Sequence, residues 1–409
     1  MGCRVRRPRF AILLVATVLA VPAVAAAATP APSTALQRKL AQALRVPHVS
    51  PARSAAIAFN LTTGTTAYSQ NPSLSLAPAS NEKLPVTYAA LATLGPGYRM
   101  ETDVLGEGEL DGTTWRGRLV LKGGGDPTLS SAGLRSLAAQ VHAFGIQRVT
   151  GGVVADESLF DARRTVVGWR SSFFLYESPP LSALVVDRAR VGGYVSRAPA
   201  LAAGATFASA LRKAGVAVPA RVQLGVASEY ALPIATVTSP PLWTVLRFMD
   251  RESDNFTAEL MLKQLGAVEA NRGTSAAGAA VVTQALAQAR VPMAGVRIVD
   301  GSGLSLLDRL TADAVTGILR AAWSNFTIRQ AFVAALPIAG VNGTLQSRLR
   351  RSPARGNVLA KTGTTREASA LSGFVRDRYA FAVLQNGNPV SSWWARRAQD
   401  RFATVLASQ

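Results

Sequence analysis

Ser80 and Lys83 form the first pair in this sequence whose residue types and spacing suit a reaction. They stand in PASNEKL, at the start of a predicted helix. Side chains three positions apart on a helix share one face, about 5–6 Å apart. Burial would lower the pKa of the lysine and leave a neutral amine that can take the serine proton. Taken alone, the pair is better explained as a helix-capping serine near a surface lysine.

Lysine is rare in this chain, so each lysine carries extra information. Of the 44 basic residues, only six are lysine, namely Lys39, Lys83, Lys122, Lys213, Lys263 and Lys361. Arginine therefore supplies positive charge almost everywhere. Arginine cannot lose its proton in a protein, whereas a desolvated lysine can act as a base.

A second group, Ser253, Asp254 and Asn255, lies in the break between two predicted helices. A loop between helices can present a serine hydroxyl and an asparagine amide to a cleft, where they relay a proton and hold a substrate amide. Taken alone, this group is better explained as a helix N-cap.

A third group, Lys361, Thr362, Gly363 and Thr364, lies on a predicted strand and is followed by Ser372. A strand can direct an ammonium group and hydroxyls at a carboxylate, and its glycine lets a substrate approach the backbone. The simpler alternative is a solvent-facing lysine on an edge strand.

Other catalytic chemistries lack their residues. The chain has two histidines, His48 and His142, and one cysteine, Cys3, which precedes the expected mature chain. A Cys/His pair is therefore excluded in the mature protein, and a Ser-His-Asp relay is disfavoured. No zinc-ligand spacing is present, so we expect neither a metal nor another cofactor. A hydrolase of this sequence needs a lysine or a carboxylate as its base.

The elements that must position these groups can be predicted from the apolar pattern. The pattern predicts a helix in ALQRKLAQALRV, a hairpin in AAIAFNLTTGTTAYSQN and a helix after Pro78. Later helices are predicted at about 275–289, 312–323 and 328–336, followed by three antiparallel strands and a helix from Trp393. An antiparallel sheet built from both ends of the chain, with helices between them, is an α+β architecture. Residues 98–234 are expected to form an inserted β-rich domain.

The first residues predict export. Four arginines precede a short apolar run that ends in small residues, which is typical of a signal peptide at 1–28. The formal charge of +20 suits a polyanionic surface in the cell envelope, although a solvated basic surface explains it equally well. No nucleic-acid module is recognisable, so no nucleic acid partner is expected.

The three groups together resemble class C low-molecular-mass penicillin-binding proteins, the D-alanyl-D-alanine carboxypeptidase/endopeptidase group. S-x-x-K with S-D-N and K-T-G is the set shared by penicillin-binding proteins and class A β-lactamases. LKGGGDPTL at 121–129, VDGSGLS at 299–305 and LPIAGVNGTL at 336–345 add to the resemblance. It implies a penicillin-binding/β-lactamase-like transpeptidase fold, with residues 29–97 and 235–409 as the catalytic domain.

The resemblance also implies a mechanism. Ser80 would attack the penultimate D-alanine carbonyl of peptidoglycan stem peptides, and Lys83 would be the general base. The backbone N–H groups of Ser80 and Thr364 would form the oxyanion hole. Penicillin and other β-lactams are expected to form the same kind of acyl-enzyme. The enzyme is expected to act outside the cytoplasmic membrane. The implied catalytic residues are Ser80, Lys83, Ser253, Asn255 and Lys361, and the implied substrate-binding residues are Thr362, Gly363 and Thr364.

The sequence leaves several points undecided. There are two alternative functions. One is a serine β-lactamase or esterase on the same scaffold, and the other is a non-catalytic wall-binding protein. The sequence does not decide whether the activity is that of a carboxypeptidase or an endopeptidase. It does not decide the oligomeric state either. Pro85 departs from a regular helix, and is tolerable only if Ser80 lies near the helix start.

Overall fold

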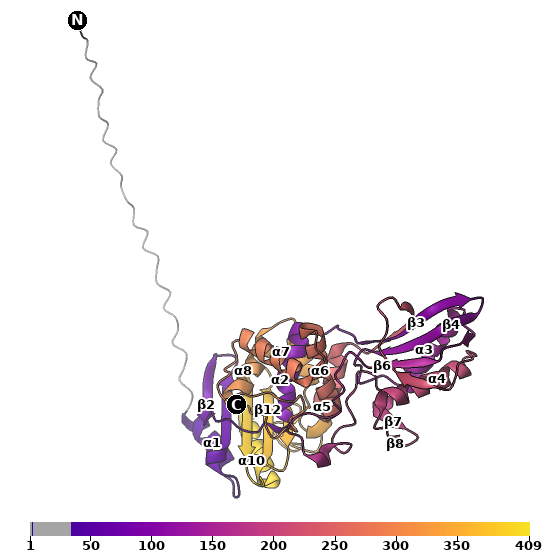
Figure 1. Ribbon diagram of the computed structural model, residues 1–409. Helices are drawn as coiled ribbons and strands as arrows, with labels where there is room; N and C mark the ends of the chain where they lie inside the picture. Colours follow the sequence, from indigo (N-terminus) through magenta and orange to yellow (C-terminus); the bar gives the residue numbers. More distant parts are fainter. Residues whose placement is uncertain (1, 3–33) are drawn as a thin grey trace. The chain divides into compact units, whose positions relative to one another are not determined.

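The central sheet joins the two ends of the described chain. The structure is a computed structural model that describes residue 2 and residues 34–409. Five strands follow the order β11–β12–β13–β1–β2, and every neighbouring pair is antiparallel (Figure 1). They are β1 (Ser54–Asn60), β2 (Thr65–Gln70), β11 (Val358–Thr364), β12 (Ala368–Val375) and β13 (Tyr379–Asn386). The sheet expected from the two ends of the chain is therefore present.

Both faces of this sheet are apolar and buried. Successive residues of a strand point to opposite faces. On β13, Ala382 and Leu384 pack into one core cluster, whereas Phe381 and Val383 pack into another. The sheet must therefore be covered by helices on both sides.

Two sets of helices provide that cover. The first face carries α2 (Lys83–Thr93), α5 (Leu242–Glu252), α6 (Asn255–Ala270), α7 (Ser275–Gln288), α8 (Ala312–Ser324) and α9 (Arg329–Ala335). The second face carries α1 (Thr34–Leu44) and α10 (Ser392–Ala407), which also contact each other. These bounds agree closely with the helices that the sequence predicts.

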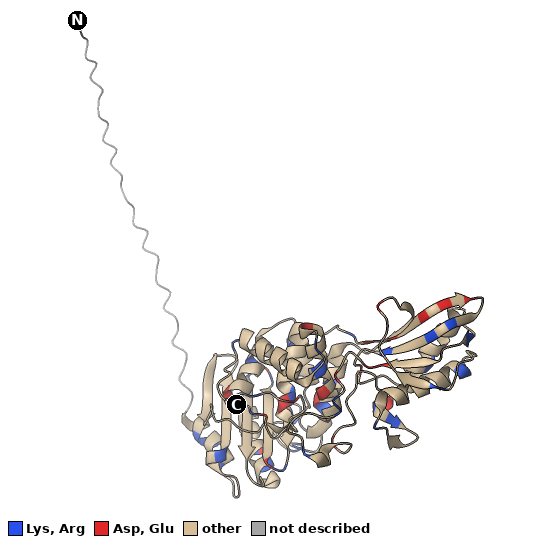
Figure 2. Cartoon of the chain, viewed as in Figure 1, with Lys and Arg blue, Asp and Glu red and all other residues tan. Residues whose placement is uncertain are grey.

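A second sheet forms between residues 101 and 238. Its order is β10–β3–β4–β6–β9, with β5 paired to β4. The strands are β3 (Glu101–Asp111), β4 (Thr114–Gly123), β5 (Arg148–Val149), β6 (Val153–Asp156), β9 (Val222–Leu224) and β10 (Leu232–Thr238). Helices α3 (Ser131–Ala143) and α4 (Pro199–Lys213) share its apolar core. Figure 2 shows acidic residues on β3 beside basic residues on β4. Glu107 of β3 forms an ion pair with Arg118 of β4.

The segment between β6 and α4 packs on the helices of the first sheet. Phe160, Leu181 and Val185 belong to the same core cluster as α2 and α6. The short elements of the segment are η3 (Ser171–Phe173), η4 (Asp187–Ala189), β7 (Arg190–Val191) and β8 (Tyr194–Val195). The division into a catalytic part and an insertion at 98–234 stays a proposal.

The prediction for the N-terminus is a signal peptide at residues 1–28. The predicted signal peptide, with Cys3, lies outside the stretch 34–409. Among the described residues, no helix combines the length and the apolar character needed to cross a membrane.

Candidate active site

Ser80 lies in a tight turn that leads directly into a helix. The turn is η2 (Ala79–Glu82), and α2 begins at the next residue, Lys83. Ala79 adopts a φ of +48°, which is uncommon for a residue with a side chain. Pro85 falls in the first turn of α2, where a backbone N–H has no partner within the helix. The requirement that Ser80 lie near the helix start is therefore met.

The amine of Lys83 is buried and sits among three oxygens. The residue has an exposed fraction of 0%. Its Nζ lies 3.1 Å from Ser80 Oγ, 2.9 Å from Asn255 Oδ1 and 2.8 Å from the carbonyl oxygen of Ser302. The arrangement fixes the amine beside the serine hydroxyl, at a distance that allows proton transfer.

Burial lowers the pKa of Lys83, although the carboxylates of Asp300, Glu259 and other acids oppose the shift. The same burial raises the pKa of Glu259 to about 8, with a further contribution from the charge of Asp300. Desolvation also holds the pKa of Glu82 well above its ordinary value. The site thus combines an amine and carboxyl groups that all lose hydration. The pKa of each group shifts in the direction that favours its neutral form.

Ser253 and Asn255 lie where α5 ends and α6 begins. Ser253 caps α5 with a φ of +58°, and Asp254 caps α6 by accepting a 2.8 Å hydrogen bond from the Thr257 N–H. The N-cap is therefore Asp254 rather than Ser253. This leaves the Ser253 hydroxyl to accept a 2.8 Å hydrogen bond from Lys361 Nζ, while the Asn255 carbonyl oxygen accepts one from Lys83.

Lys361 lies on β11 and is as buried as Lys83. Burial, with the charge of Lys83 as a second cause, lowers the pKa of Lys361 to about 7, while the charge of Asp250 opposes the shift. The hydroxyl of Thr362 lies 2.8 Å from that of Thr344. The alternative of a solvent-facing lysine is wrong, because the Lys361 side chain is enclosed.

Gly363 and Thr364 complete β11. A Cβ at Gly363 would lie 2.8 Å from the carbonyl oxygen of Pro78, so the strand approaches the Ser80 turn too closely for a side chain. Thr364 is exposed at the end of the strand. The eight residues that the sequence singles out thus come from one turn with the helix start that follows it, one helix junction and one strand, which meet at a single place.

Known proteins resemble this chain along most of its length. A family model described as the D-Ala-D-Ala carboxypeptidase 3 (S13) family matches residues 36–197 and 190–409. This chain belongs to that S13 family. The family predicted from the three sequence groups is confirmed.

Curated relatives of this S13 chain cover most of its length. A D-alanyl-D-alanine carboxypeptidase of an Actinomadura species is 32% identical over 97% of this chain and 88% of its own. Carboxypeptidase DacB of Mycolicibacterium smegmatis is 34% identical over 85% of this chain and 78% of its own.

A solved structure supports the fold. Penicillin binding protein 4 (dacB) of Haemophilus influenzae aligns with a TM-score of 0.79, at 23% identity, over 91% of this chain and 98% of its own. The same protein complexed with a β-lactam aligns with a TM-score of 0.74. The α+β fold of the penicillin-binding class is therefore confirmed.

The turn at 299–305 holds the carbonyl oxygen of Ser302 beside Lys83. Asp300 accepts hydrogen bonds from the N–H groups of Gly303 and Ser305, at 2.6 and 2.7 Å. Glu259 accepts from the N–H of Ser302 at 2.9 Å. These carboxylates hold the turn in the shape that directs the Ser302 carbonyl at Lys83. These contacts make residues 299–305 a supporting turn beside Lys83.

Several residues near the S13 site carry no signal in the sequence. Asp250 is fully buried and accepts a 2.7 Å hydrogen bond from the Thr87 hydroxyl. Three others come from the segment after β6: the Trp169 indole N–H donates to Asp300 at 2.8 Å, Arg188 pairs with Asp254 at 2.6 Å, and the backbone oxygen of Glu177 accepts from Asn255 at 3.1 Å. Their distance along the chain hides them, since only folding brings them to the site.

Proposed function

We propose that this S13 chain is a serine-type D-alanyl-D-alanine carboxypeptidase that acts on peptidoglycan stem peptides through an acyl-enzyme on Ser80. The observation that carries the proposal is the buried amine of Lys83, 3.1 Å from the Ser80 hydroxyl. A desolvated amine at that distance can accept the serine proton without an imidazole. The names of the curated relatives support the same reaction.

In the first step, Ser80 Oγ forms a bond to the carbonyl carbon of the penultimate D-alanine and passes its proton to Lys83. The developing negative charge on the carbonyl oxygen is stabilised by the backbone N–H groups of Ser80 and Thr364. The C–N bond to the terminal D-alanine then breaks as its nitrogen takes a proton through Ser253 and Lys83. Ser253 Oγ accepts a 2.8 Å hydrogen bond from Lys361 Nζ, which orients this hydroxyl in the site.

The remaining polar groups hold the substrate. Lys361 and Thr362 bind the terminal carboxylate, and Asn255 holds the peptide amide. The glycine at 363 keeps β11 free of a side chain where the peptide backbone passes. Water then attacks the ester carbonyl, which releases the shortened peptide and restores the Ser80 hydroxyl.

We infer that the reaction takes place outside the cytoplasmic membrane, since its substrate lies there. The proposed signal peptide at 1–28 would then be removed on export. Mass spectrometry of the protein purified from the outer compartment should find an N-terminus near residue 29. A chain that retains residues 1–28 would contradict this part of the proposal.

The central test uses muropeptides and fluorescent penicillin. The wild-type protein should remove the terminal D-alanine from pentapeptides and retain a covalent penicillin label. Ser80→Ala should lose both, while the control Ser391→Ala, in a residue without a side-chain cap contact, should keep both. Label persisting on Ser80→Ala would place the nucleophile elsewhere.

The same experiment separates the alternatives. Rapid release of penicillin would indicate a β-lactamase, and peptidoglycan binding without any label would indicate a non-catalytic wall protein. Cross-linked muropeptide dimers included in the assay report endopeptidase activity, because both reactions use an equivalent D-alanyl carbonyl.

A further inference from the structure

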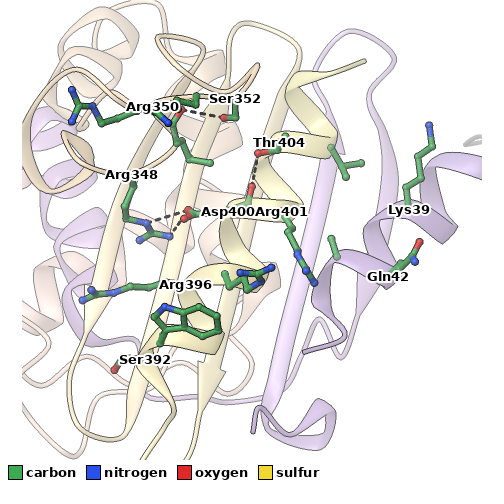
Figure 3. A pocket seen from close by; sticks show the side chains of 16 residues that line it. Lys39, Gln42, Arg348, Arg350, Ser352, Ser392, Arg396, Asp400, Arg401 and Thr404 are labelled. Carbon is green, nitrogen blue, oxygen red and sulfur yellow. Dashed lines mark hydrogen bonds and ion pairs between the residues drawn. The ribbon is translucent and has the colours of Figure 1, made fainter. Parts of the chain in front are cut away.

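A basic groove lies between α1, α10 and the loop that follows η5 (Gly343–Leu345). The groove has a volume of about 1180 Å³. Its cationic lining consists of Arg348, Arg350 and Arg351 from the loop and Arg396, Arg397 and Arg401 from α10. Lys39 adds a charge from α1, as Figure 3 shows. None of the proposed catalytic residues lines this groove.

The charges of the groove are mostly uncompensated. Asp400 is its one acidic lining residue, and it is occupied by Arg348 at 2.7 Å. Figure 3 shows this pair in the middle of the groove. Among residues 34–409, the other cations of the groove form no ion pair with a carboxylate. A concave surface with so many unpaired cations of one sign attracts a polyanion.

The arginines of α10 are spaced for a row of anions. Arg397 and Arg401 are four residues apart and lie on one helix face with Trp393. One helical turn rises about 5.4 Å, so the row presents one cation per turn. The Arg397 guanidinium lies 5.2 Å from the centre of the Trp393 ring, and Trp393 as a whole residue is 60% exposed.

The basic surface continues beyond the groove. A second hollow of about 540 Å³ is lined by Arg350, Arg351 and Arg355, and so shares two residues with the groove. At the other side, Arg396 donates a 3.3 Å hydrogen bond to Thr364 Oγ1, at the end of the β11 strand. The surface is therefore elongated and reaches the edge of the candidate active site.

We propose that this groove binds a linear phosphodiester polymer of the cell envelope and so holds the enzyme on the wall next to its substrate. A guanidinium matches the two free oxygens of a phosphodiester with paired hydrogen bonds. Such a polymer carries one negative charge in every backbone repeat, so successive phosphates can lie against Arg397 and Arg401. Stem-peptide carboxylates sit on short branches and form no continuous row.

Other occupants fit the groove less well. The N-terminal residues 1–33 contain four arginines and no acidic residue, so they are repelled by it. A second copy of the chain is also strongly basic, with a net charge of +20. A membrane surface is broad, whereas these arginines line a concave groove.

The test compares two triple variants that remove the same charge. The groove variant carries Arg351→Gln, Arg397→Gln and Arg401→Gln. The control variant carries Arg135→Gln, Arg148→Gln and Arg212→Gln, which are exposed residues of α3, β5 and α4 away from the groove. Binding to fluorescent poly(glycerol phosphate) is measured at fixed ionic strength, because screening weakens such contacts.

The groove variant should bind about tenfold more weakly than the wild type, and the control variant should stay within about twofold. Acylation by penicillin should be unchanged in both variants, which shows that they fold and separates this test from that of the proposed function. The single variants Arg351→Gln and Arg401→Gln, each expected to weaken binding two- to threefold, serve the same purpose if the triple variant does not fold.

Three outcomes would overturn the proposal. Equal losses in both triple variants would mean that binding follows net charge alone. Equally tight, groove-dependent binding of poly-glutamate would remove the preference for phosphodiesters. Groove-dependent binding to phosphatidylglycerol vesicles that exceeds binding to the polymer would assign the surface to a membrane.

Discussion

The two buried lysines of the site differ through their charged neighbours. Lys83 lies within the field of four acids, Asp300, Glu259, Asp254 and Asp250, whereas Lys361 is opposed by Lys83 and supported by Asp250 alone. Burial lowers both pKa values, so the tasks of the two amines are separated by position: Lys83 Nζ lies 3.1 Å from Ser80 Oγ, whereas Lys361 Nζ lies 2.8 Å from Ser253 Oγ. In the proposed mechanism, Lys83 transfers the proton and Lys361 binds the carboxylate.

The task of Lys83 can be tested with a basic side chain that cannot give up its proton. Lys83→Arg should slow penicillin acylation by about 10²–10⁴-fold, the usual contribution of a general base. Arginine cannot act as a base in a protein. Lys213→Arg, at an exposed position of α4, is the matched control and should acylate normally. Normal acylation of Lys83→Arg would remove Lys83 from the mechanism.

The task of Lys361 predicts a pH effect. If its charged form binds a carboxylate, kcat/KM for penicillin should fall as the pH rises through about 7, the pKa to which burial lowers this amine. An ester substrate without a carboxylate should show no such fall. Lys361→Arg keeps its charge, so any activity that it retains should be level across this range. A fall of equal size with the uncharged ester would contradict the assignment.

At the scale of the elements, close backbone contacts keep Ser80 in place. The turn at 299–305 passes against the turn of η2, and Gly303 has a φ of +82°. A Cβ at Gly303 would collide with the carbonyl oxygen of Ala79, the residue before the nucleophile. The geometry of Ser80 thus depends on an element more than two hundred residues away.

Gly303→Ala should therefore reduce penicillin acylation at least tenfold, together with thermal stability. Gly112→Ala serves as the control, since Gly112 also has a positive φ, +57°, but has no atom within 4 Å of its added Cβ. The control should lose about 1 kcal/mol of stability from backbone strain and keep its acylation rate. Equal effects of the two substitutions on acylation would show that the contact with Ala79 does not matter.

At the scale of the whole molecule, the segment after β6 links the second sheet to the site. Trp169 contacts Asp300, Arg188 contacts Asp254, and Glu177 contacts Asn255. Each contact reaches a residue that touches or supports the proposed machinery. The segment therefore helps to position the site, although it belongs to the region between the first two sequence groups.

Removing the Trp169 N–H tests this link. Trp169→Phe should leave one oxygen of Asp300 without that donor, at a cost of about 1–3 kcal/mol, and should slow acylation severalfold. The control is Trp115→Phe, because the buried N–H of Trp115 has no hydrogen-bond partner among the described residues. Melting curves and acylation rates measured together should show the acylation defect only in Trp169→Phe. A similar acylation defect in both variants would show that lost packing, and not the lost N–H, causes the effect.

The sequence by itself determined the candidate reactive groups and the elements that carry them. Ser80 with Lys83, Ser253 with Asn255, and Lys361 are recognisable because each has a fixed local spacing and the chain contains few lysines. Apolar periodicity likewise predicts the terminal strands and the main helices. These features are local, so short-range sequence patterns are enough to find them.

Only the tertiary structure decided which other groups join them. The Ser302 carbonyl, Asp250 and Trp169 reach the site through contacts between residues far apart in sequence. The basic groove also joins α1, α10 and a loop that no sequence pattern connects. Burial and long-range pairing arise from the packing of the whole chain, and they set the pKa of each lysine and the surroundings of each charge.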